Sequence, residues 1–145
     1  MSIADVMTVQ VVSVGPGDSI GHAIRRMADE NVGAVTVTQD GVLLGIFTER
    51  DVLRLAGAGE PLDGRPVSEV MTSRLFVARP DDDIASVAEM MRTRAIRHVP
   101  VVEDGRLLGV ISVRDVMAAL IERLWRSHDE RAHDTARGLL ARNSR

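Results

Sequence analysis

The stretch VTVTQDGVLLGIFTERDV, residues 35–52, returns as VPVVEDGRLLGVISVRDV at residues 99–116, an offset of 64 residues. The same offset aligns the Val-Met-Thr of residues 6–8 with that of residues 70–72. No gap is needed across about fifty positions, and about a third of the aligned residues are identical. The chain is therefore built from two copies of one unit.

Both copies predict the same order of elements. An extended stretch comes first (residues 9–14 and 74–78), and a helix follows for which Asp18 or Asp82 is the expected N-cap. Two β-branched strands come next, joined by Asp-Gly, the favoured type I′ hairpin turn. These strands are expected at residues 34–38 and 43–47, and again at residues 99–102 and 107–111. A second helix is expected from Glu49 in the first copy and from Val113 in the second.

The sequence therefore predicts an α+β fold of two β-α-β-β-α repeats. One such unit has too few core residues to be stable alone, so the two should pack together around a pseudo-twofold axis. The expected boundaries are residues 1–56 for the first repeat, 57–66 for a linker rich in Gly and Pro, 67–121 for the second repeat and 122–145 for a C-terminal helical tail. Apolar residues of this tail form either a weak stripe for a partner helix or part of a frayed, solvated helix.

Composition excludes several function classes. The net charge of −3, without a basic block, and the presence of only two Phe and one Trp argue against a nucleic-acid partner. No apolar run approaches the roughly 18 residues of a membrane span, and the N-terminus does not resemble a secretory signal. The absence of Cys is consistent with a cytoplasmic protein and excludes thiolate catalysis. His22, His128 and His133 have no metal-ligand spacing, so no metal site is expected.

With both copies in register, the sequence resembles the cystathionine β-synthase (CBS) domain, and the tandem resembles a CBS pair, or Bateman module, over roughly residues 1–120. The resemblance rests on the Val-Met-Thr start, the Gly-h-h-Ser/Thr-x-x-Asp motifs of residues 45–51 and 109–115 (h is an apolar residue), and residues 96–117. It implies a regulatory sensor that binds AMP, ADP, ATP, NAD(H) or S-adenosylmethionine in two clefts between the repeats. It also implies a homodimer, with no required cofactor.

In the family, each cleft combines the start of one repeat with the Gly-h-h-Ser/Thr-x-x-Asp motif of the other. Carried over to this chain, site one comprises Gly45, Ile46, Thr48, Asp51, Thr72, Phe76, Val77, Arg97 and His98. Site two comprises Thr8, Val12, Ser13, Gly109, Val110, Ser112 and Asp115.

The chemistry of these residue types suits a nucleotide. A carboxylate such as Asp51 or Asp115 can accept hydrogen bonds from both hydroxyls of a ribose, and a helix start favours phosphate. The alternative is that Thr48 with Asp51, and Ser112 with Asp115, are helix-capping pairs, and both interpretations can hold together.

The remaining site residues have structural alternatives as well. The residues of the two extended starts can equally be core residues. Arg97 and His98 are expected to bind phosphate, or else Arg97 is simply exposed and His98 packed. The first copy has Gly33 and Ala34 at these positions, so site one is expected to prefer more highly phosphorylated ligands than site two.

Two other functions compete with the sensor. One is a structural or stress interaction protein that acts through its dimer surface and has vestigial ligand sites. The other is an enzyme that uses the same clefts, but the sequence offers no paired acid and base, no activated Ser and no metal cluster.

Overall fold

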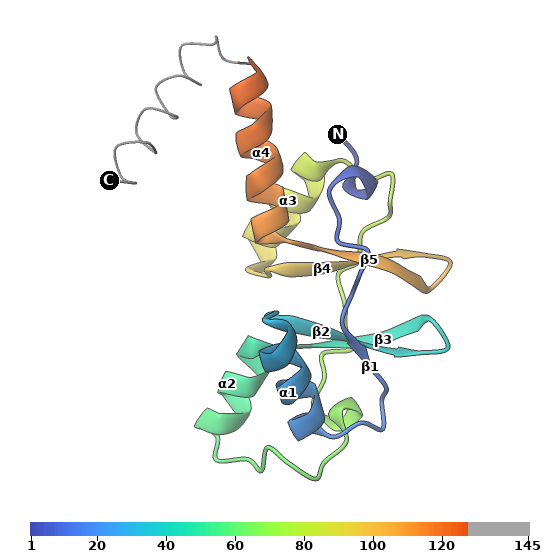
Figure 1. The fold of residues 1–145 in the computed structure, drawn as a ribbon, viewed down its shortest axis with the longest axis vertical. Coiled ribbons are helices and arrows are strands. Elements are labelled where there is room, and N and C mark those ends of the chain that lie inside the picture. Colours follow the sequence, from blue (N-terminus) through green and yellow to red (C-terminus); the bar gives the residue numbers. More distant parts are fainter. Residues whose placement is uncertain (128–145) are drawn as a thin grey trace.

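A computed structural model of the chain describes residues 1–127. The protein has two halves, each made of a β-hairpin covered on its outer face by two helices (Figure 1). In the first half these elements are β1 (Ser13–Val14), α1 (Ile20–Glu30), β2 (Ala34–Gln39), β3 (Val42–Thr48) and α2 (Glu49–Gly57). In the second half they are α3 (Ile84–Arg94), β4 (His98–Glu103), β5 (Arg106–Ser112) and α4 (Val113–Ser127). Two short 3₁₀ turns, Ile3–Asp5 and Val67–Glu69, precede the halves in the chain.

The strands form one sheet in the order β1-β2-β3-β5-β4. The hairpins β2–β3 and β4–β5 are antiparallel, and they are joined only at Val42 and Arg106, beside the two turns. From that point the hairpins diverge as two layers that face each other, with α1 and α2 outside one layer and α3 and α4 outside the other (Figure 1). The predicted α+β fold of paired repeats with a C-terminal helix is therefore confirmed. Residues 128–145, which include His128, His133 and most of the expected tail, lie outside the described residues.

Local signals in the sequence determine the hairpin turns. Asp40 and Gly41 have φ values of 53° and 80°, and Asp104 and Gly105 have φ values of 51° and 77°. Two consecutive positive φ angles are the mark of a type I′ turn, as the Asp-Gly pairs predicted.

The predicted N-caps are wrong by one residue in both repeats. Asp18 accepts a hydrogen bond from the N–H of Gly15 (2.7 Å), and Asp82 accepts one from the N–H of Arg79 (2.8 Å). Each carboxylate therefore closes a turn that precedes the helix. The caps are Ser19, which accepts from the N–H of His22, and Asp83, which accepts from the N–H of Ala85.

The extended starts are also shorter than predicted. In the first repeat only Ser13 and Val14 form a strand, and they pair with β2 in parallel. In the second repeat a single bridge between Ala78 and Val101 takes the same place beside β4.

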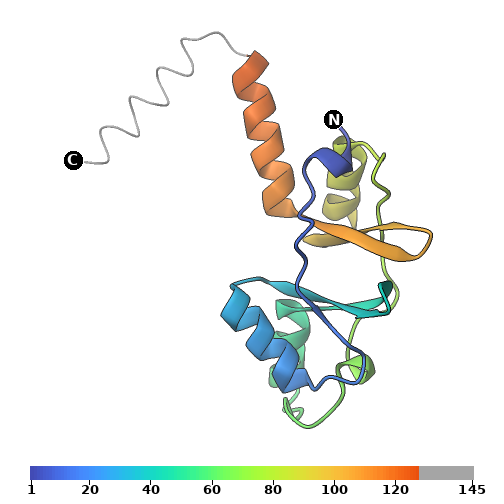
Figure 2. The ribbon, with the colours of Figure 1, turned by 45° about the vertical axis from the view of Figure 1, so that its right-hand side comes forward.

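The first segment of each repeat packs in the half formed by the other repeat. The prediction of two contiguous β-α-β-β-α units did not include this exchange. Ile3 is fully buried in the core of the second half, and its N–H donates to the carbonyl of Asp82 (2.9 Å). Val67 is fully buried in the core of the first half, and its N–H donates to the carbonyl of Asp18 (2.7 Å). Figure 2 shows the N-terminal segment running from the second half across to β1 in the first. Each half is therefore completed by chain from the other repeat.

Candidate functional site

The exchanged segments bring Thr72 next to Ile46, Thr48 and Asp51, four of the residues predicted for site one. Asp51 lies in the first turn of α2 and is buried, with 4% of its surface exposed. Its Oδ2 accepts from the N–H of Thr48 (2.9 Å) and from the Thr48 hydroxyl (3.2 Å). Its Oδ1 accepts a longer hydrogen bond from the hydroxyl of Thr72 (3.4 Å). Thr72 is held there because its backbone pairs in both directions with Ile46 of β3 (2.9 and 3.0 Å).

Gly45 has a packing role at this point. A Cβ on residue 45 would lie 2.5 Å from the sulfur of Met71 and 3.0 Å from the carbonyl oxygen of Thr72. Only glycine lets the segment of residues 71–72 approach β3 this closely. Gly109 repeats the arrangement, because a Cβ there would lie 2.7 Å from the carbonyl oxygen of Thr8.

Site two has the same frame with looser contacts. Thr8 pairs in both directions with Val110 of β5 (2.9 and 3.0 Å), as Thr72 does with Ile46. Asp115 Oδ2 accepts from the N–H of Ser112 (2.8 Å) and from its hydroxyl (2.9 Å), and the Ser112 hydroxyl accepts from the N–H of Asp115 (3.1 Å). Asp115 is only half-buried, and no hydrogen bond joins it to Thr8 in the described part of the chain.

The capping interpretation is thus confirmed at both helix starts. A capping box occupies one oxygen of each carboxylate and leaves the other, Oδ1, with weak partners at most. At Asp51 these partners are the Thr72 hydroxyl and the guanidinium of Arg54, 3.6 Å away. Oδ1 of Asp51 therefore takes no part in the cap.

The expected strand residues lie on the surface or at its edge. Phe76 is 41% exposed, and Val77 is similarly exposed, so core packing is the wrong interpretation for both. The guanidinium of Arg94 lies 4.8 Å from the centre of the Phe76 ring, a cation–π contact that the sequence did not indicate.

In site two, Val12 and Ser13 are half-buried beside β2. The Val12 carbonyl accepts from the N–H of Thr36 (3.0 Å), and the Ser13 and Thr36 hydroxyls share a hydrogen bond of 2.6 Å. These two residues therefore hold the segment of residues 8–13 against the sheet.

Arg97 and His98 lie where the two halves face each other, beside the start of α2. His98 is half-buried, and its ring approaches to 3.4 Å of the position that a Cβ on Gly33 would take. Burial lowers the pKa of His98, while the carboxylates of Glu49 and Asp115 act in the opposite direction. Arg97 is exposed. Among the described residues, neither side chain forms a hydrogen bond with Thr48 or Asp51, so their predicted part in site one stays a prediction.

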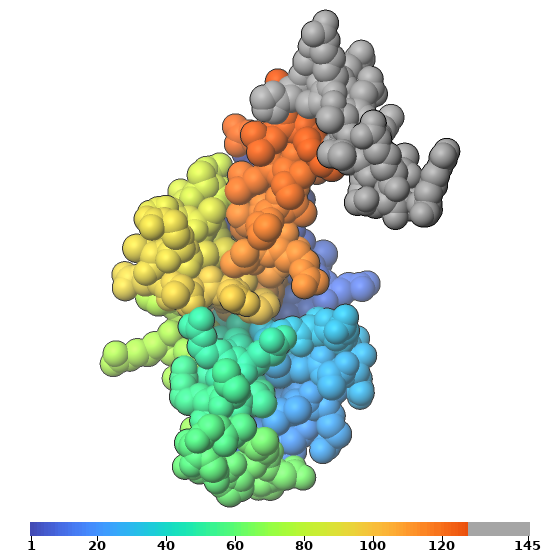
Figure 3. All heavy atoms as spheres, turned by 90° about the vertical axis from the view of Figure 1, so that its left-hand side faces the viewer, coloured from blue at the N-terminus to red at the C-terminus, as the bar shows by residue number. Residues whose placement is uncertain are grey.

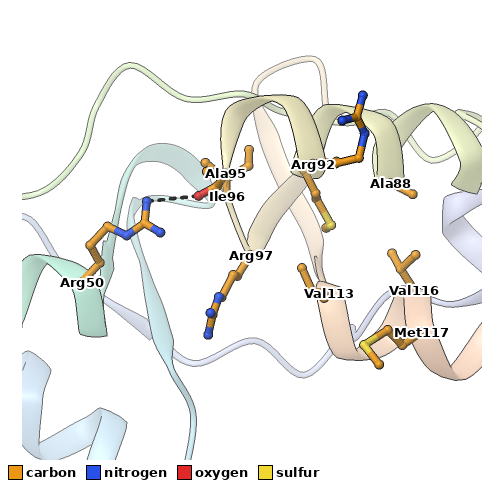
Figure 4. A pocket seen from close by; sticks show the side chains of 10 residues that line it. Arg50, Ala88, Arg92, Ala95, Ile96, Arg97, Val113, Val116 and Met117 are labelled. Atoms are coloured by element: carbon orange, nitrogen blue, oxygen red, sulfur yellow. Dashed lines mark hydrogen bonds between the residues drawn. The ribbon is translucent and has the colours of Figure 1, made fainter.

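Three arginines surround a cavity of about 440 Å³ next to this point, between α3, α4 and the start of α2 (Figure 4). Arg50 donates to the carbonyl of Ala95 across the two halves (3.0 Å), Arg92 is paired with Glu89, and Arg97 points away from α4. The floor is apolar: Ala88, Met91, Ile96, Val113, Val116 and Met117. Figure 3 views this side of the molecule, with α4 in orange above α2 in green. The cavity is adjacent to site one and shares only Arg97 with it.

A smaller cavity of about 230 Å³ lies along the start of the first repeat and includes Ser13 of site two. Its other lining residues are Val9, Val11, Thr38, Gly41, Leu107 and Leu108. It is smaller than the roughly 300 Å³ at which ligand pockets usually begin.

The sequence pattern of the family described as "CBS domain" matches residues 3–57 and residues 67–122. The chain belongs to the CBS domain family. It is 38% identical over 117 residues to the CBS domain-containing protein YhcV of Bacillus subtilis, covering 79% of this chain and 82% of that protein. The crystal structure of the CBS-domain containing protein ATU1752 from Agrobacterium tumefaciens superposes with a TM-score of 0.75, at 40% identity, over 82% of this chain and 98% of that one.

A further solved structure of the same fold contains a ligand. The CBS domain protein PAE2072 from Pyrobaculum aerophilum, complexed with AMP, has a TM-score of 0.74 and 29% identity, over 79% of this chain and 89% of that one. In this chain, no helix among residues 1–127 is long and apolar enough to cross a membrane, and no group of His, Asp and Glu there could hold a metal ion.

Sequence reasoning missed one residue beside the site, Glu49. Its carboxylate oxygen lies 2.7 Å from the position that a Cβ on Gly33 would take. The repeat carried a signal, because the two copies differ at this position: the residue aligned with Glu49 is Val113. An acidic residue in the first turn of a helix is common, so Glu49 did not stand out in the sequence.

Proposed function

We propose that this CBS pair is a non-enzymatic, cytoplasmic sensor that binds an adenosine-containing ligand, with Asp51 as the ribose acceptor of site one. The observation that carries the proposal is a buried carboxylate at a helix start, one of whose oxygens has only long contacts. The AMP complex of the relative from Pyrobaculum aerophilum supports the ligand class.

The contacts of site one suggest how such a ligand would bind. The two ribose hydroxyls would donate to Asp51 Oδ1 and replace the long hydrogen bond from Thr72. Adenine would lie along the segment of residues 72–77, where Phe76 and Val77 offer exposed apolar surface. Phosphates would extend toward Arg97, whose guanidinium has no hydrogen-bonded partner among the described residues, and the start of α2 adds a favourable partial charge.

Binding would be sensed because site one spans both halves. Asp51 and Thr48 belong to the first half, whereas Arg97 belongs to the second, and the hydrogen bond from Arg50 to Ala95 already crosses between them. A ligand that bridges the halves favours the arrangement in which both sets of residues can reach it, and it shifts the population by the difference in affinity.

Calorimetric titration with AMP, ADP, ATP, NADH and S-adenosylmethionine tests the proposal, with a thermal-shift series as a second readout. We expect at least one of them to bind, and a ligand at 100 times its Kd to stabilise the protein by about 2.7 kcal/mol. Turnover of the ligand would contradict the non-enzymatic assignment. Absence of binding by all five would contradict the sensor.

A specific observation also favours the second candidate function, an interaction protein that acts through its dimer surface. Five residues of α4 (Met117, Leu120, Ile121, Leu124 and Trp125) are large, apolar and exposed. The residue of α2 aligned with Met117 is Leu53, which is 74% exposed. We infer that α2 and α4 form the homodimer surface, because such a stripe is costly to leave in water.

Light scattering after gel filtration tests the dimer. Leu120→Glu is expected to yield a monomer, whereas Gln39→Glu, which adds the same charge at an exposed hairpin end, should leave the dimer intact. A monomeric parent protein would contradict the inference. The interaction function replaces the sensor only if the dimer forms and no adenosine compound binds.

A further inference from the structure

The exposed face of α4 carries an apolar stripe with the spacing of a coiled coil. Val113, Met117, Leu120 and Leu124 follow one another at intervals of four, three and four residues. These intervals are those of the a and d positions of a heptad, which form one narrow stripe along a helix. The last three of these side chains are large and exposed, and Val113 is half-buried. These four residues form the α4 seam.

The seam is separate from the face by which α4 packs on its own half. Val116 and Ala119 are the buried residues of this helix, and they lie in the core of the second half. The charged residues of α4 all lie outside the seam: Arg114, Asp115, Glu122, Arg123 and Arg126. Because an uninterrupted apolar stripe is costly to leave in water, the seam indicates a partner that presents a matching stripe.

The equivalent positions of the first repeat do not form such a stripe. The residues aligned with the seam are Glu49, Leu53, Ala56 and Glu60. Only Leu53 is both large and apolar, and it is exposed. Glu60 lies beyond the end of α2 at Gly57 and is paired with Arg65. A second copy that presented α2 to the seam would therefore place the Glu60 carboxylate opposite Leu124.

The positions of α2 and α4 allow two arrangements of a homodimer. Both helices lie on one side of the molecule and lead away from its middle in opposite directions (Figures 1 and 3). A twofold axis along the molecule sets α4 against α4 of the second copy and α2 against α2, which is a head-to-head dimer. An axis across the molecule sets α4 against α2, which is a head-to-tail dimer. Only the first arrangement gives the α4 seam an identical seam as its partner.

We propose that two copies of this chain associate head-to-head, with their α4 seams packed in parallel. The inference rests on the homodimer of the proposed function and gives that dimer an orientation. A stable interface buries about 800 Å² on each partner, which is more than the seam of one helix offers. The contact therefore continues through Leu53, which the same axis places opposite Leu53 of the second copy. In this dimer the C-terminal ends of both α4 helices lie at the same end.

Cysteine cross-linking tests the orientation, because the chain contains no Cys. Leu120→Cys places a thiol in the seam, and the matched control Ala118→Cys places one at an exposed position of the same helix outside it. Head-to-head association sets the two residues 120 opposite each other, within the reach of a disulfide. Head-to-tail association sets them roughly 20 Å apart, because each lies about 10 Å along α4 from the middle of the molecule.

The full-length single-cysteine proteins are equilibrated in a glutathione redox buffer, and the disulfide-linked fraction is measured by mass spectrometry. We expect this fraction to be at least about tenfold higher for Leu120→Cys than for Ala118→Cys, because the dimer gives the seam thiols a high effective concentration. A mixture of Leu53→Cys and Met117→Cys, unfolded and refolded together, tests the alternative. Each variant should be linked to itself, and a predominance of the mixed disulfide would overturn the proposal.

The failure of the dimer and the failure of its orientation give different results. A parent protein that is monomeric by light scattering would overturn the homodimer and this inference with it. A dimeric parent protein in which Leu120→Cys links no better than Ala118→Cys would overturn the orientation alone. Leu124→Cys, the next seam position, replaces Leu120→Cys if that protein does not fold or does not dimerise, and the same two results then decide.

Discussion

Replacing Asp51 with alanine separates its two roles, capping and ligand binding. The substitution removes the acceptor of the Thr48 N–H (2.9 Å), of the Thr48 hydroxyl (3.2 Å) and of the Thr72 hydroxyl (3.4 Å). Loss of a helix cap costs about 0.5–2 kcal/mol, and the Thr72 contact is too long to add much, so we expect a loss of about 1–2 kcal/mol. For a chain of 145 residues this corresponds to a fall in Tm of roughly 2–8 °C.

Asp51→Ala should also raise the Kd of the ligand. Each hydrogen bond from a ribose hydroxyl to a carboxylate contributes about 1.5–3 kcal/mol, and the ligand would compete for Oδ1 with the long contacts from Thr72 and Arg54. A net loss of 1.4 kcal/mol or more is a tenfold or larger rise in Kd.

Thermal unfolding of the free protein and calorimetry with AMP measure these two quantities independently. Asp115→Ala is the matched control. It removes a capping box of the same kind, lowers Tm and leaves AMP binding at site one unchanged. An Asp51→Ala protein with the lower Tm but an unaltered Kd would show that Asp51 is a cap only, and the ribose assignment would be refuted.

Three further predictions concern stability. Gly45→Ala should lower the free energy of unfolding by about 1–3 kcal/mol, because the added methyl would meet Met71 and Thr72. Gly57→Ala, whose added methyl would have no atom within 4 Å, should not lower it. Equal effects of the two substitutions in urea unfolding would contradict the close approach of residues 71–72 to β3. Ile3→Ala should cost about 2–5 kcal/mol if the N-terminal turn completes the second core, and a surface-like loss below 0.5 kcal/mol would contradict the exchange. Because burial lowers the pKa of His98 in the folded state, the unfolded chain binds more protons, and stability that is present above pH 6.5 should be lost as the pH falls below it. The Tm of His98→Gln, measured from pH 8 to pH 5, should therefore fall less steeply than the Tm of the parent protein. Parallel curves for the two proteins would count against a buried, uncharged ring.

The repeat made most of this fold predictable. A gapless offset of 64 residues, Asp-Gly turns and the apolar spacing determined the order of helices and strands, because these are local signals that one sequence carries in full. The N-caps were misplaced because Asp18 and Ser19 are both good caps, and the choice depends on the turn that Asp18 closes with Gly15. The exchange of Ile3 and Val67 between cores was not predictable from periodicity, since three-residue turns carry too few apolar positions to show which core they enter.

The candidate site was predictable to a lesser degree. The family resemblance paired Thr72 with Asp51 and Thr8 with Val110, and the structure brings both pairs together. The repeat showed that Arg97 aligns with Gly33, but not that the carboxylate of Glu49 lies beside Gly33. A side chain that turns from its own helix toward a glycine in a neighbouring strand leaves no pattern along the sequence.

A crystal structure of the protein grown with AMP tests the central claim most directly. The account predicts that the ribose hydroxyls lie within hydrogen-bond distance of Asp51 Oδ1, with Thr72 displaced from that oxygen and the phosphate directed toward Arg97. AMP bound elsewhere, with the Thr72 hydroxyl still on Asp51 Oδ1, would contradict it.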